Sequence, residues 1–579
     1  MSKWNYKNLF YVRGQYETNN LYMTRLSILF FCQLLFANCF LSAQSLLGQK
    51  KQYTRADTLR GSLRPERTCY DVTFYDLYVK VDTADRAITG RNRIVFATVE
   101  DFQTMQIDLF ENMKINSITA NGNELKYRRE FNAVFVEMNE PVKSGTKGEI
   151  TVNYSGNPTV AKRAPWDGGF SWSYDRNGKS WIAVSCEGMG ASCWWPCKDY
   201  LGDEPDSMRI SCNVPDSLRC VANGREEDAE TLPDGTKTYN WFVHYPINNY
   251  NVTLNIGNYV TFHDNYKADD GALLSIDYYV MPYNLEKAKK QFTQVKPMLK
   301  CYEKYLGKYP FWEDGYALVE TPYLGMEHQG AIAYGNKYLT GYAGIDYSRI
   351  GLDFDYIIIH ESGHEWWGNS VSCRDIADMW IHEGFCTYSE SIYVEYMFGR
   401  DTALKYINAH KTQVGNEGPV VGIYGLNEEG DGDMYSKGSL FLNTIRTLVN
   451  DDKLWWSMIK GMCDTTFKMK NINYENVVTY FNKKSGISLS SVFEQYLKYA
   501  SIPLLEYKLK KKKKGEFELT YRWVTDVPNF TMPVVVSTPE NAKQFLKGNN
   551  DFQTTTIQLK KESGFIVRDD LEYIDVKKM

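Results

Sequence analysis

The spacing of apolar residues changes twice along the chain and divides it into three parts. From about residue 69 to 262, apolar and polar residues alternate or form short apolar runs between Gly, Asn, Asp and Pro turns. This pattern is typical of β-strands. From about residue 284 to 500 the apolar residues recur at helical spacing, and after Pro503 the β pattern returns. The sequence therefore predicts a multidomain α+β protein.

Individual segments set the expected domain boundaries. The clearest strand patterns are 71–81, 91–97, 149–154, 207–214, 251–260, 505–510, 516–523, 531–537 and 554–560. The clearest helical patterns are 285–306, 352–370, 375–398, 437–450 and 490–499. We expect an N-terminal β domain at 44–266, a mainly helical domain at 267–502 and a small C-terminal β-sandwich at 503–579. The basic run from Lys510 to Lys514 ends in Gly515 between two strand patterns and indicates a solvated hairpin turn.

Composition narrows the class of protein. A chain of 579 residues exceeds what one hydrophobic core can organise. Its 43% hydrophobic and 15% aromatic residues exclude a disordered or collagen-like chain. The 66 basic and 71 acidic residues give a net charge of −5. Because nucleic-acid binders usually carry a basic surplus, we expect no nucleic-acid partner.

The first residues resemble a targeting signal. Four basic residues precede the apolar stretch 26–41; they are Lys3, Lys7, Arg13 and Arg25. This stretch is short for a membrane-spanning helix, which needs about 20 residues. We predict a signal peptide at 1–43, cleaved after Ala43, with lipid attachment at Cys39 as the weaker alternative. Met1 and Met23 both remain possible starts.

Export follows from that prediction. We expect a periplasmic, cell-surface or secreted protein, without a membrane span in the mature chain. Ten of the 12 cysteines follow the signal, and export would permit disulfides among them. Their pairing stays open. The sequence contains no C-x-x-C pair, which disfavours a zinc ribbon.

The helical region contains a metal-site pattern at 360–364, His-Glu-Ser-Gly-His, of the form H-E-x-x-H. Two histidines four residues apart lie on one helical face, so both imidazoles can face one ion, while Glu361 can reach a water on it. Zinc needs a third protein ligand and an open position. Glu383, in a second helical pattern, can supply that ligand if the two helices pack together. We therefore predict one zinc ion held by His360, His364 and Glu383. The metzincin continuation is excluded, because Trp367 and Ser370 stand where it requires Gly and His.

With this motif, the chain resembles the zinc aminopeptidases related to aminopeptidase N, among the thermolysin-like gluzincins. The resemblance rests on H-E-x-x-H and on four further segments. These are Trp366-x-Gly368-Asn369, Trp380-Ile381-x-Glu383-Gly384-Phe385, Tyr435-Ser436-Lys437-Gly438 and Trp195-Pro196-Cys197-x-Asp199. Upstream, Leu324-Gly325-Met326-Glu327-His328 resembles the family's G-x-M-E-N motif, with Leu324 and His328 departing from it.

The resemblance implies a thermolysin-like catalytic domain and a set of residue roles. Glu361 is expected to be the general base that takes a proton from a metal-activated water, and Tyr435 the donor to the oxyanion. Glu327 and Glu187 are expected to bind the free N-terminal amine of a peptide. Met326 and Gly325 complete the expected substrate site. Separately, Asp378 is a candidate for orienting a ligand imidazole.

These features predict a zinc-dependent aminopeptidase that hydrolyses the N-terminal bond of peptides. The first alternative is a zinc endopeptidase on the same fold, which Glu327 and Glu187 disfavour because they suit a free amine. The second is a peptide-binding protein without turnover, which the complete set of catalytic residues disfavours.

Overall fold

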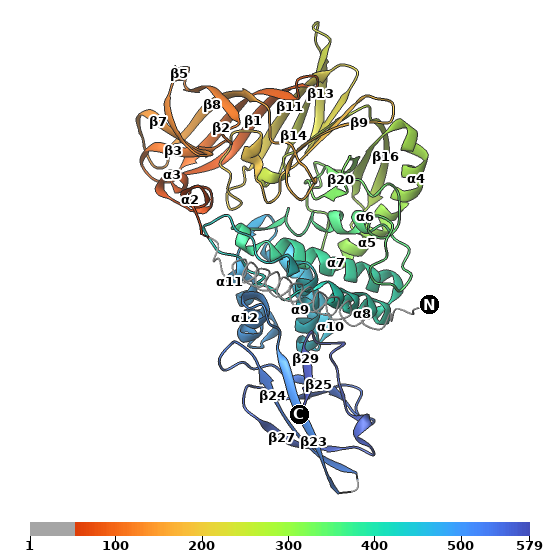
Figure 1. Ribbon diagram of the computed structural model, residues 1–579. Helices are drawn as coiled ribbons and strands as arrows, with labels where there is room; N and C mark the ends of the chain where they lie inside the picture. The colour runs from red at the N-terminus through yellow and green to blue at the C-terminus, as the bar shows by residue number, and fades with distance from the viewer. Residues whose placement is uncertain (1–51, 514) are drawn as a thin grey trace, which may run out of the picture. The chain divides into compact units, whose positions relative to one another are not determined.

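The computed structural model describes residues 52–513 and 515–579. The predicted signal peptide at 1–43 lies outside these residues, as do Met23, Cys39 and Lys514. Residues Arg55–Met579 form one unit, in which β, helical and β regions follow one another along the chain (Figure 1). Within the described residues, no helix combines the length and the apolar character needed to cross a bilayer.

Alternating burial builds the N-terminal β region. Its strands are β1 (Tyr70–Asp82), β2 (Ala87–Thr98), β3 (Phe102–Asp108), β4 (Met113–Ala120), β5 (Asn123–Glu124), β6 (Lys126–Glu130), β7 (Ala133–Val142), β8 (Lys147–Gly156), β9 (Gly169–Tyr174), β10 (Ser180–Ser185), β11 (Ser207–Pro215), β12 (Arg219–Ala222), β13 (Arg225–Thr231), β14 (Thr236–Val243) and β15 (Leu254–Gly257). In β1, Tyr75, Leu77, Val79 and Val81 are buried, with more exposed residues between them. This strand is central to an eight-stranded sheet of order β13-β14-β11-β1-β2-β8-β4-β5. The sheets β12-β15-β10-β9 and β3-β7-β6 complete the region.

The helical region combines a five-stranded sheet with nine α-helices. Its sheet has the order β16-β17-β18-β20-β19, from β16 (Val260–Lys267), β17 (Leu273–Val280), β18 (Tyr316–Glu320), β19 (Gly325–Met326) and β20 (Ile332–Tyr334). The helices are α4 (Leu285–Gln291), α5 (Val295–Tyr305), α6 (Tyr356–Gly363), α7 (Trp380–Phe398), α8 (Arg400–Ala409), α9 (Ser436–Val449), α10 (Asp452–Gly461), α11 (Tyr474–Ser485) and α12 (Ser490–Lys498). A short parallel pair, β21 (Val371–Cys373) and β22 (Lys470–Ile472), lies between them in sequence. Helix α7 is central, because it contacts α5, α6, α8 and α9 and buries every residue from Trp380 to Val394.

Two sequence predictions need correction in this region. Strand β16 pairs antiparallel with β17, so the predicted domain boundary between residues 266 and 267 falls inside a strand of the helical region's sheet. The predicted helix at 285–306 is two helices separated by a 3₁₀ turn at Phe292–Gln294. Pro297 accounts for the break, because it lacks an N–H and its ring is tolerated only in the first turn of the new helix.

The C-terminal region consists of two small sheets, which agrees with the predicted β-sandwich. One sheet has the order β27-β24-β23-β29 and the other β26-β25-β28. Their strands are β23 (Leu504–Lys513), β24 (Glu516–Val524), β25 (Val534–Ser537), β26 (Gln544–Leu546), β27 (Gln553–Gln558), β28 (Ile566–Val567) and β29 (Asp575–Lys578). Strands β23 and β24 form the expected hairpin, and Lys510 to Lys513 extend β23 into solvent.

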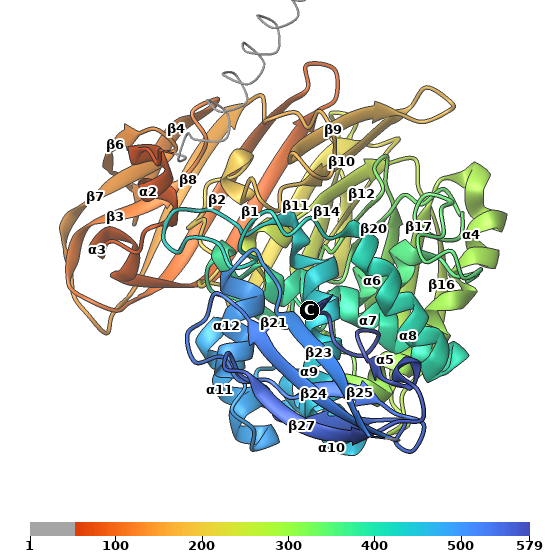
Figure 2. The same ribbon diagram turned by 60° about the horizontal axis from the view of Figure 1, so that its bottom comes forward.

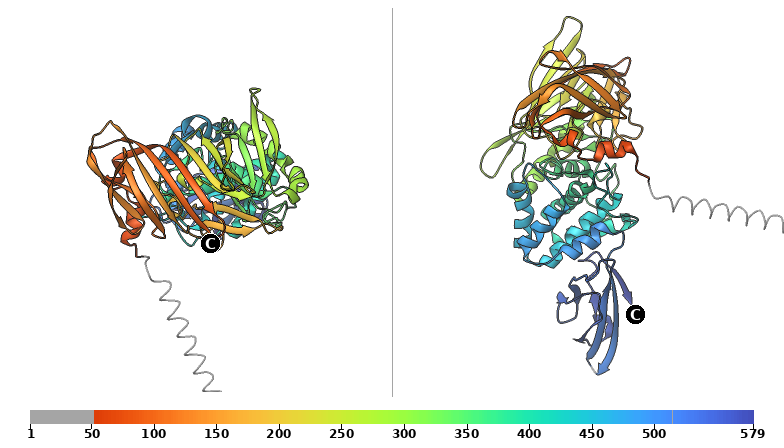
Figure 3. Two further views of the ribbon diagram at one scale, coloured as in Figure 1. Left: turned by 90° about the horizontal axis from the view of Figure 1, so that it is seen from above. Right: turned by 90° about the vertical axis from the view of Figure 1, so that its left-hand side faces the viewer.

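These C-terminal sheets are drawn in blue in Figure 2, and the region that contains them is joined to the helices by hydrogen bonds. The Tyr496 hydroxyl donates to the Tyr573 carbonyl at 2.6 Å, and the Tyr573 N–H donates to Thr444 Oγ1 at 2.9 Å. Within residues 55–579 the helical region lies between the two β regions, as the side view in Figure 3 shows.

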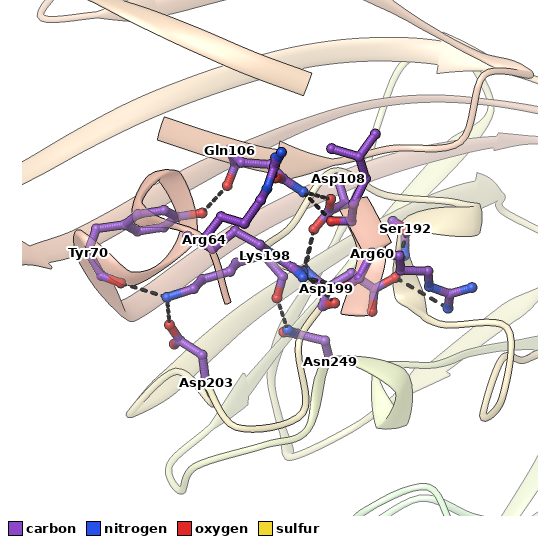
Figure 4. Close-up of polar contacts among 12 residues, drawn as sticks. Arg60, Arg64, Tyr70, Gln106, Asp108, Ser192, Lys198, Asp199, Asp203 and Asn249 are labelled. Carbon is purple, nitrogen blue, oxygen red and sulfur yellow. Dashed lines mark hydrogen bonds and ion pairs between the residues drawn. The ribbon is translucent and has the colours of Figure 1, made fainter. Parts of the chain in front are cut away.

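A buried polar cluster attaches the short helices α2 (Arg55–Gly61) and α3 (Pro65–Thr68) to the N-terminal sheets. At its centre is Asp108, which accepts hydrogen bonds from the Gln106 side chain at 2.8 Å and the Asp199 N–H at 3.0 Å (Figure 4). Arg67, also buried, donates to Asp108 at 2.9 Å and to the Asp199 carbonyl at 2.7 Å. Asp199 in turn accepts from the Ser192 hydroxyl at 2.5 Å, which ties down the loop after β10.

Replacing Arg67 by Met is expected to destabilise the protein, because Asp108 would stay buried without its charge partner. Removal of one member of a buried ion pair costs about 3–5 kcal/mol. Urea unfolding followed by circular dichroism measures the change. The control is Lys80→Met, which breaks an ion pair with Asp234 whose side chains are 49% and 51% exposed. That variant should lose no more than about 1 kcal/mol. Equal losses in both variants would contradict a special role for the buried pair.

Candidate functional site

Helices α6 and α7 bring the three predicted metal ligands together. Asp355 begins α6 by accepting hydrogen bonds from the N–H groups of the next turn, and the buried run Ile357 to Ile359 anchors that turn. His360 Nε2 and His364 Nε2 are 3.2 Å apart. Glu383 Oε2 lies 3.6 Å from the first and 3.5 Å from the second of these atoms.

This arrangement fits a zinc ion. Glu383 Oε2 is buried and makes no hydrogen bond within the described residues, although it faces both imidazoles. A buried carboxylate oxygen without a hydrogen bond is costly unless a cation meets it. The two imidazole nitrogens and this oxygen are the donor types that a catalytic zinc site uses.

Cys386 is a rival ligand by proximity, since its sulfur lies near the two histidines. The thiol, however, donates to the His360 backbone carbonyl at 2.9 Å. In addition, the cavity at the site is lined by His360, His364 and Glu383 but not by Cys386. The set of two histidines and a glutamate is therefore the better fit.

Hydrogen bonds on the far side of each imidazole set its tautomer. His360 Nδ1 lies 2.7 Å from Glu390 Oε1, and His364 Nδ1 lies 2.9 Å from the Trp367 carbonyl. Because both partners are acceptors, each Nδ1 carries the proton and each Nε2 presents its lone pair. The Tyr406 hydroxyl donates to the second oxygen of Glu390 at 2.5 Å and fixes that carboxylate.

The prediction that Asp378 orients a ligand imidazole is wrong. Its carboxylate accepts from Trp380 Nε1 at 3.1 Å, the Tyr424 hydroxyl at 3.0 Å and the Tyr474 N–H at 3.0 Å. Asp378 thus connects the start of α7 to its neighbours. Glu390 performs the predicted task instead. It lies seven residues after Glu383, so helical periodicity places both on one face of α7, which is the signal that identifies it.

Glu361 lies beside the edge strand β19. A Cβ atom on Gly325 would come within 2.5 Å of Glu361 Oε1, so the glycine permits this close approach. Burial raises the pKa of Glu361 to about 7, and nearby carboxylates add to the shift while the two imidazoles oppose it. A carboxylate with such a pKa is suited to exchange protons near neutral pH.

A chain of hydrogen bonds that the sequence does not reveal holds Glu327 in place. His382 Nε2 accepts from the Cys373 N–H at 2.8 Å, so its Nδ1 carries the proton. That Nδ1 lies 3.4 Å from the Tyr250 hydroxyl, which donates to Glu327 Oε1 at 3.0 Å. His382 and Tyr250 therefore hold the carboxylate of Glu327 in place. No local pattern points to Tyr250, which comes from the N-terminal β region.

A second carboxylate comes from that β region. Glu187 follows β10 and lines the same cavity as Glu327. Burial raises the pKa of Glu187 well above its ordinary value, and the negative charge of Glu327 adds to this. Burial also raises the pKa of Glu327. A cation placed between two such carboxylates would favour the ionised form of both.

The cavity, of about 500 Å³, connects all but one of the predicted site residues. Its lining includes Glu187, Gly325, Met326, Glu327, His360, Glu361, His364, Glu383 and Tyr435, but not Asp378. The Tyr435 ring stacks on His360 with centroids 6.3 Å apart. Burial and the surrounding carboxylates raise the pKa of Tyr435, so the phenol keeps its proton and can donate it in a hydrogen bond. Of the two departures from G-x-M-E-N, Leu324 lines the cavity and His328 does not.

Replacing Glu390 by Gln is expected to weaken zinc binding by about tenfold or more, because outer partners of ligand histidines typically contribute 10–100-fold to metal affinity. Competition of the protein against a fluorescent zinc chelator measures this. The matched control is Asp378→Asn, a buried carboxylate on the same stretch of chain without contact to an imidazole. It should bind zinc like the unmodified protein. A loss confined to the Asp378 variant would reverse our assignment.

Comparison with known proteins agrees with this geometry. The Peptidase M1 N-terminal domain model matches residues 72–250 and the Peptidase family M1 domain model matches residues 283–496. Probable aminopeptidase 1 of Saccharolobus solfataricus is 20% identical over 410 residues, which are 68% of this chain and 49% of that protein. Aminopeptidase N of Escherichia coli is 24% identical over 273 residues, 44% of this chain and 31% of its own. The chain spans about half the length of the first of these curated relatives.

A solved structure has the same fold. It is a mutant of the M1 zinc metallopeptidase from Deinococcus radiodurans, bound to a Tyr-Ser-Ala substrate, with a TM-score of 0.62 and 19% identity. The match covers 77% of this chain and 98% of that one. The two family models together cover more than half of the sequence, including the Glu187 loop and both ligand helices. The chain therefore belongs to the peptidase M1 family.

Proposed function

We propose that the protein is a zinc aminopeptidase that removes the first residue of peptides. The observation that carries this proposal is a pair of carboxylates, half-buried Glu187 and buried Glu327, that line the cavity together with the ligand His364. The negative charge of each disfavours ionisation of the other, and an ammonium group between them offsets that repulsion. A free peptide N-terminus supplies such a group one residue away from the bond to be cleaved.

The remaining residues account for the chemistry. His360, His364 and Glu383 would hold a zinc ion, which would supply Lewis-acid polarisation of the scissile carbonyl and a lower pKa, toward about 7, for a water. Glu361 accepts a proton from the attacking water and delivers it to the leaving nitrogen. Tyr435 keeps its phenolic proton and donates a hydrogen bond to the oxygen that becomes negative. The amine-binding carboxylates disfavour an endopeptidase, because a continuing chain would bury them without a cation.

We also propose that the protein is exported. The support is the basic start followed by the apolar stretch 26–41 and Ala43, which suit a cleaved signal. Expression of the full chain should yield a mature protein that begins after residue 43 in the exported fraction. N-terminal sequencing measures this, and a retained residue 1–43 segment in the cytoplasm would contradict it. A chain that begins at residue 44 is the control and should stay in the cytoplasm.

Replacing Glu327 by Gln is expected to raise KM for free-amine substrates, because one charge-assisted hydrogen bond to the ammonium is lost. Such a contact contributes about 1.5–3 kcal/mol, or roughly 10- to 100-fold. Hydrolysis of aminoacyl coumarin amides, beside their N-acetylated forms, measures the effect. The control is Glu286→Gln, whose side chain on α4 is 83% exposed and should change nothing.

Two further measurements test the proposal as a whole. Glu361→Gln should abolish turnover and still bind zinc, and a chelator should abolish turnover of the unmodified enzyme. Cleavage of N-acetylated substrates would move the assignment to an endopeptidase. Binding of peptides without turnover by the zinc-loaded protein would instead favour a peptide-binding protein.

A further inference from the structure

The two ends of the cavity differ in chemistry. The end beside His364 contains Glu327, whose carboxylate lies within 4.8 Å of the ligand atoms of His364 and Glu383. The end beside His360 contains aromatic groups: Tyr356 stacks on the His360 ring at 5.2 Å between centroids, and Tyr406 hydrogen-bonds to Glu390 behind that ring. Since the amine of a substrate belongs at the anionic end, the chain beyond the cleaved bond extends toward the aromatic end.

His410 lies at this aromatic end. It follows α8 directly, lines the cavity, and packs its ring against Tyr406 with centroids 5.3 Å apart. The residue is buried, with 8% of its surface exposed. The described residues offer no hydrogen-bond partner for its Nε2 atom.

The tautomer of His410 follows from its other nitrogen. Nδ1 lies 3.2 Å from Ser436 Oγ, and the Ser436 hydroxyl donates to Gln413 Oε1 at 2.9 Å. Because the single hydroxyl proton is used for Gln413, the proton between His410 and Ser436 belongs to Nδ1. Burial lowers the pKa of His410, so the ring is neutral. Its Nε2 therefore presents a lone pair that needs a donor.

A bound peptide can offer a backbone N–H group as the hydrogen-bond donor to His410 Nε2. Beyond the cleaved bond, its backbone carries N–H groups, and the first of these after the leaving nitrogen belongs to the third residue. An extended chain advances about 3.3 Å per residue, so this N–H lies one residue further into the aromatic end. Thr387, one helical turn after Glu383, lines the same cavity and has a buried hydroxyl without a partner in the part of the chain that the structure describes. Two unsatisfied polar groups along one cavity suit a peptide backbone better than an apolar leaving group.

We propose that His410 accepts a hydrogen bond from the backbone N–H of the third substrate residue and is a specificity-determining residue. The enzyme then favours peptides of three or more residues over dipeptides and aminoacyl amides, which lack that N–H. This inference rests on the proposed aminopeptidase function and adds a length preference to it.

The test compares substrates with and without the donor. They are a tripeptide, the same tripeptide N-methylated at its third residue, and an aminoacyl coumarin amide. His410→Phe should lower kcat/KM for the tripeptide by about five- to tenfold, the size expected for one hydrogen bond, and leave the coumarin amide unchanged. N-methylation should cost the unmodified enzyme the same factor and cost the variant nothing further.

Two further variants make the test independent of folding and of unrelated histidine effects. His410→Asn keeps a donor toward Ser436 through its amide nitrogen. Its shorter side chain leaves no acceptor at the position of the imidazole Nε2, so it should repeat the result. His263→Phe, at a histidine whose side chain is 71% exposed on β16, should leave all three substrates unchanged. Equal losses on the tripeptide and the coumarin amide, or a methylation cost that persists in the His410 variants, would overturn the proposal.

A binding measurement separates this proposal from the proposed function. In the Glu361→Gln background, calorimetry should find the tripeptide bound about five- to tenfold more weakly when His410 is also replaced by Phe. The coumarin amide should bind equally to both proteins. Unchanged tripeptide affinity would overturn the role of His410, whereas absence of turnover by the unmodified enzyme, with this affinity difference present, would contradict only the aminopeptidase assignment.

Discussion

The cost of burying charge is the constraint on which the rest of the structure depends. Helix α7 places Glu383 and Glu390 in buried positions, where an unpaired carboxylate is energetically costly. Glu390 meets the protonated nitrogen of His360, but one oxygen of Glu383 meets only imidazole nitrogens that carry lone pairs. A divalent cation satisfies all of these atoms together. Zinc binding and the packing of α6 against α7 are therefore linked, and a variant at Glu390 reports on both.

The same constraint explains why the site needs the N-terminal β region. Glu187 arrives on a loop of that region, and Tyr250 of the same region holds Glu327. The loop is tied to Asp199 through Ser192, and Asp199 belongs to the cluster around Asp108 in Figure 4. The selection of a free amine that we propose thus depends on polar contacts well away from the metal ligands. The catalytic helices alone would hold zinc without these carboxylate contacts.

Substrate direction follows from the unequal ends of the cavity. In the proposed function, the carboxylates beside His364 bind an ammonium group, while the aromatic rings and His410 beside His360 face the departing chain. Only one peptide orientation satisfies both ends, because the charge is at one end and the unpaired acceptor at the other. The length preference assigned to His410 is a consequence of this direction.

Local patterns were sufficient for the parts of the protein that depend on periodicity. The order of β, helical and β regions was predicted, as were both ligand helices, since alternation and helical spacing record which face of an element is buried. His360, His364 and Glu383 were identified because four-residue spacing puts two imidazoles on one face. The prediction of one continuous helix at 285–306 was wrong because Pro297 interrupts the helical hydrogen bonding. The predicted domain boundary at 266 was wrong because the pairing of β16 with β17 is not a local property of the sequence.

The sequence by itself thus determined the metal-ligand set and the order of the regions. Only the tertiary structure decided which groups complete the site. Asp378 lies five residues before Glu383 and turns to Tyr424 and Tyr474, whereas Tyr250 reaches Glu327 from a distant strand region. The tautomer of His410, on which its proposed role depends, could be assigned only from its hydrogen bond with Ser436. The physical reason is that spacing records which face of its own element a residue occupies, while hydrogen bonds and charge contacts between elements arise only when the elements pack.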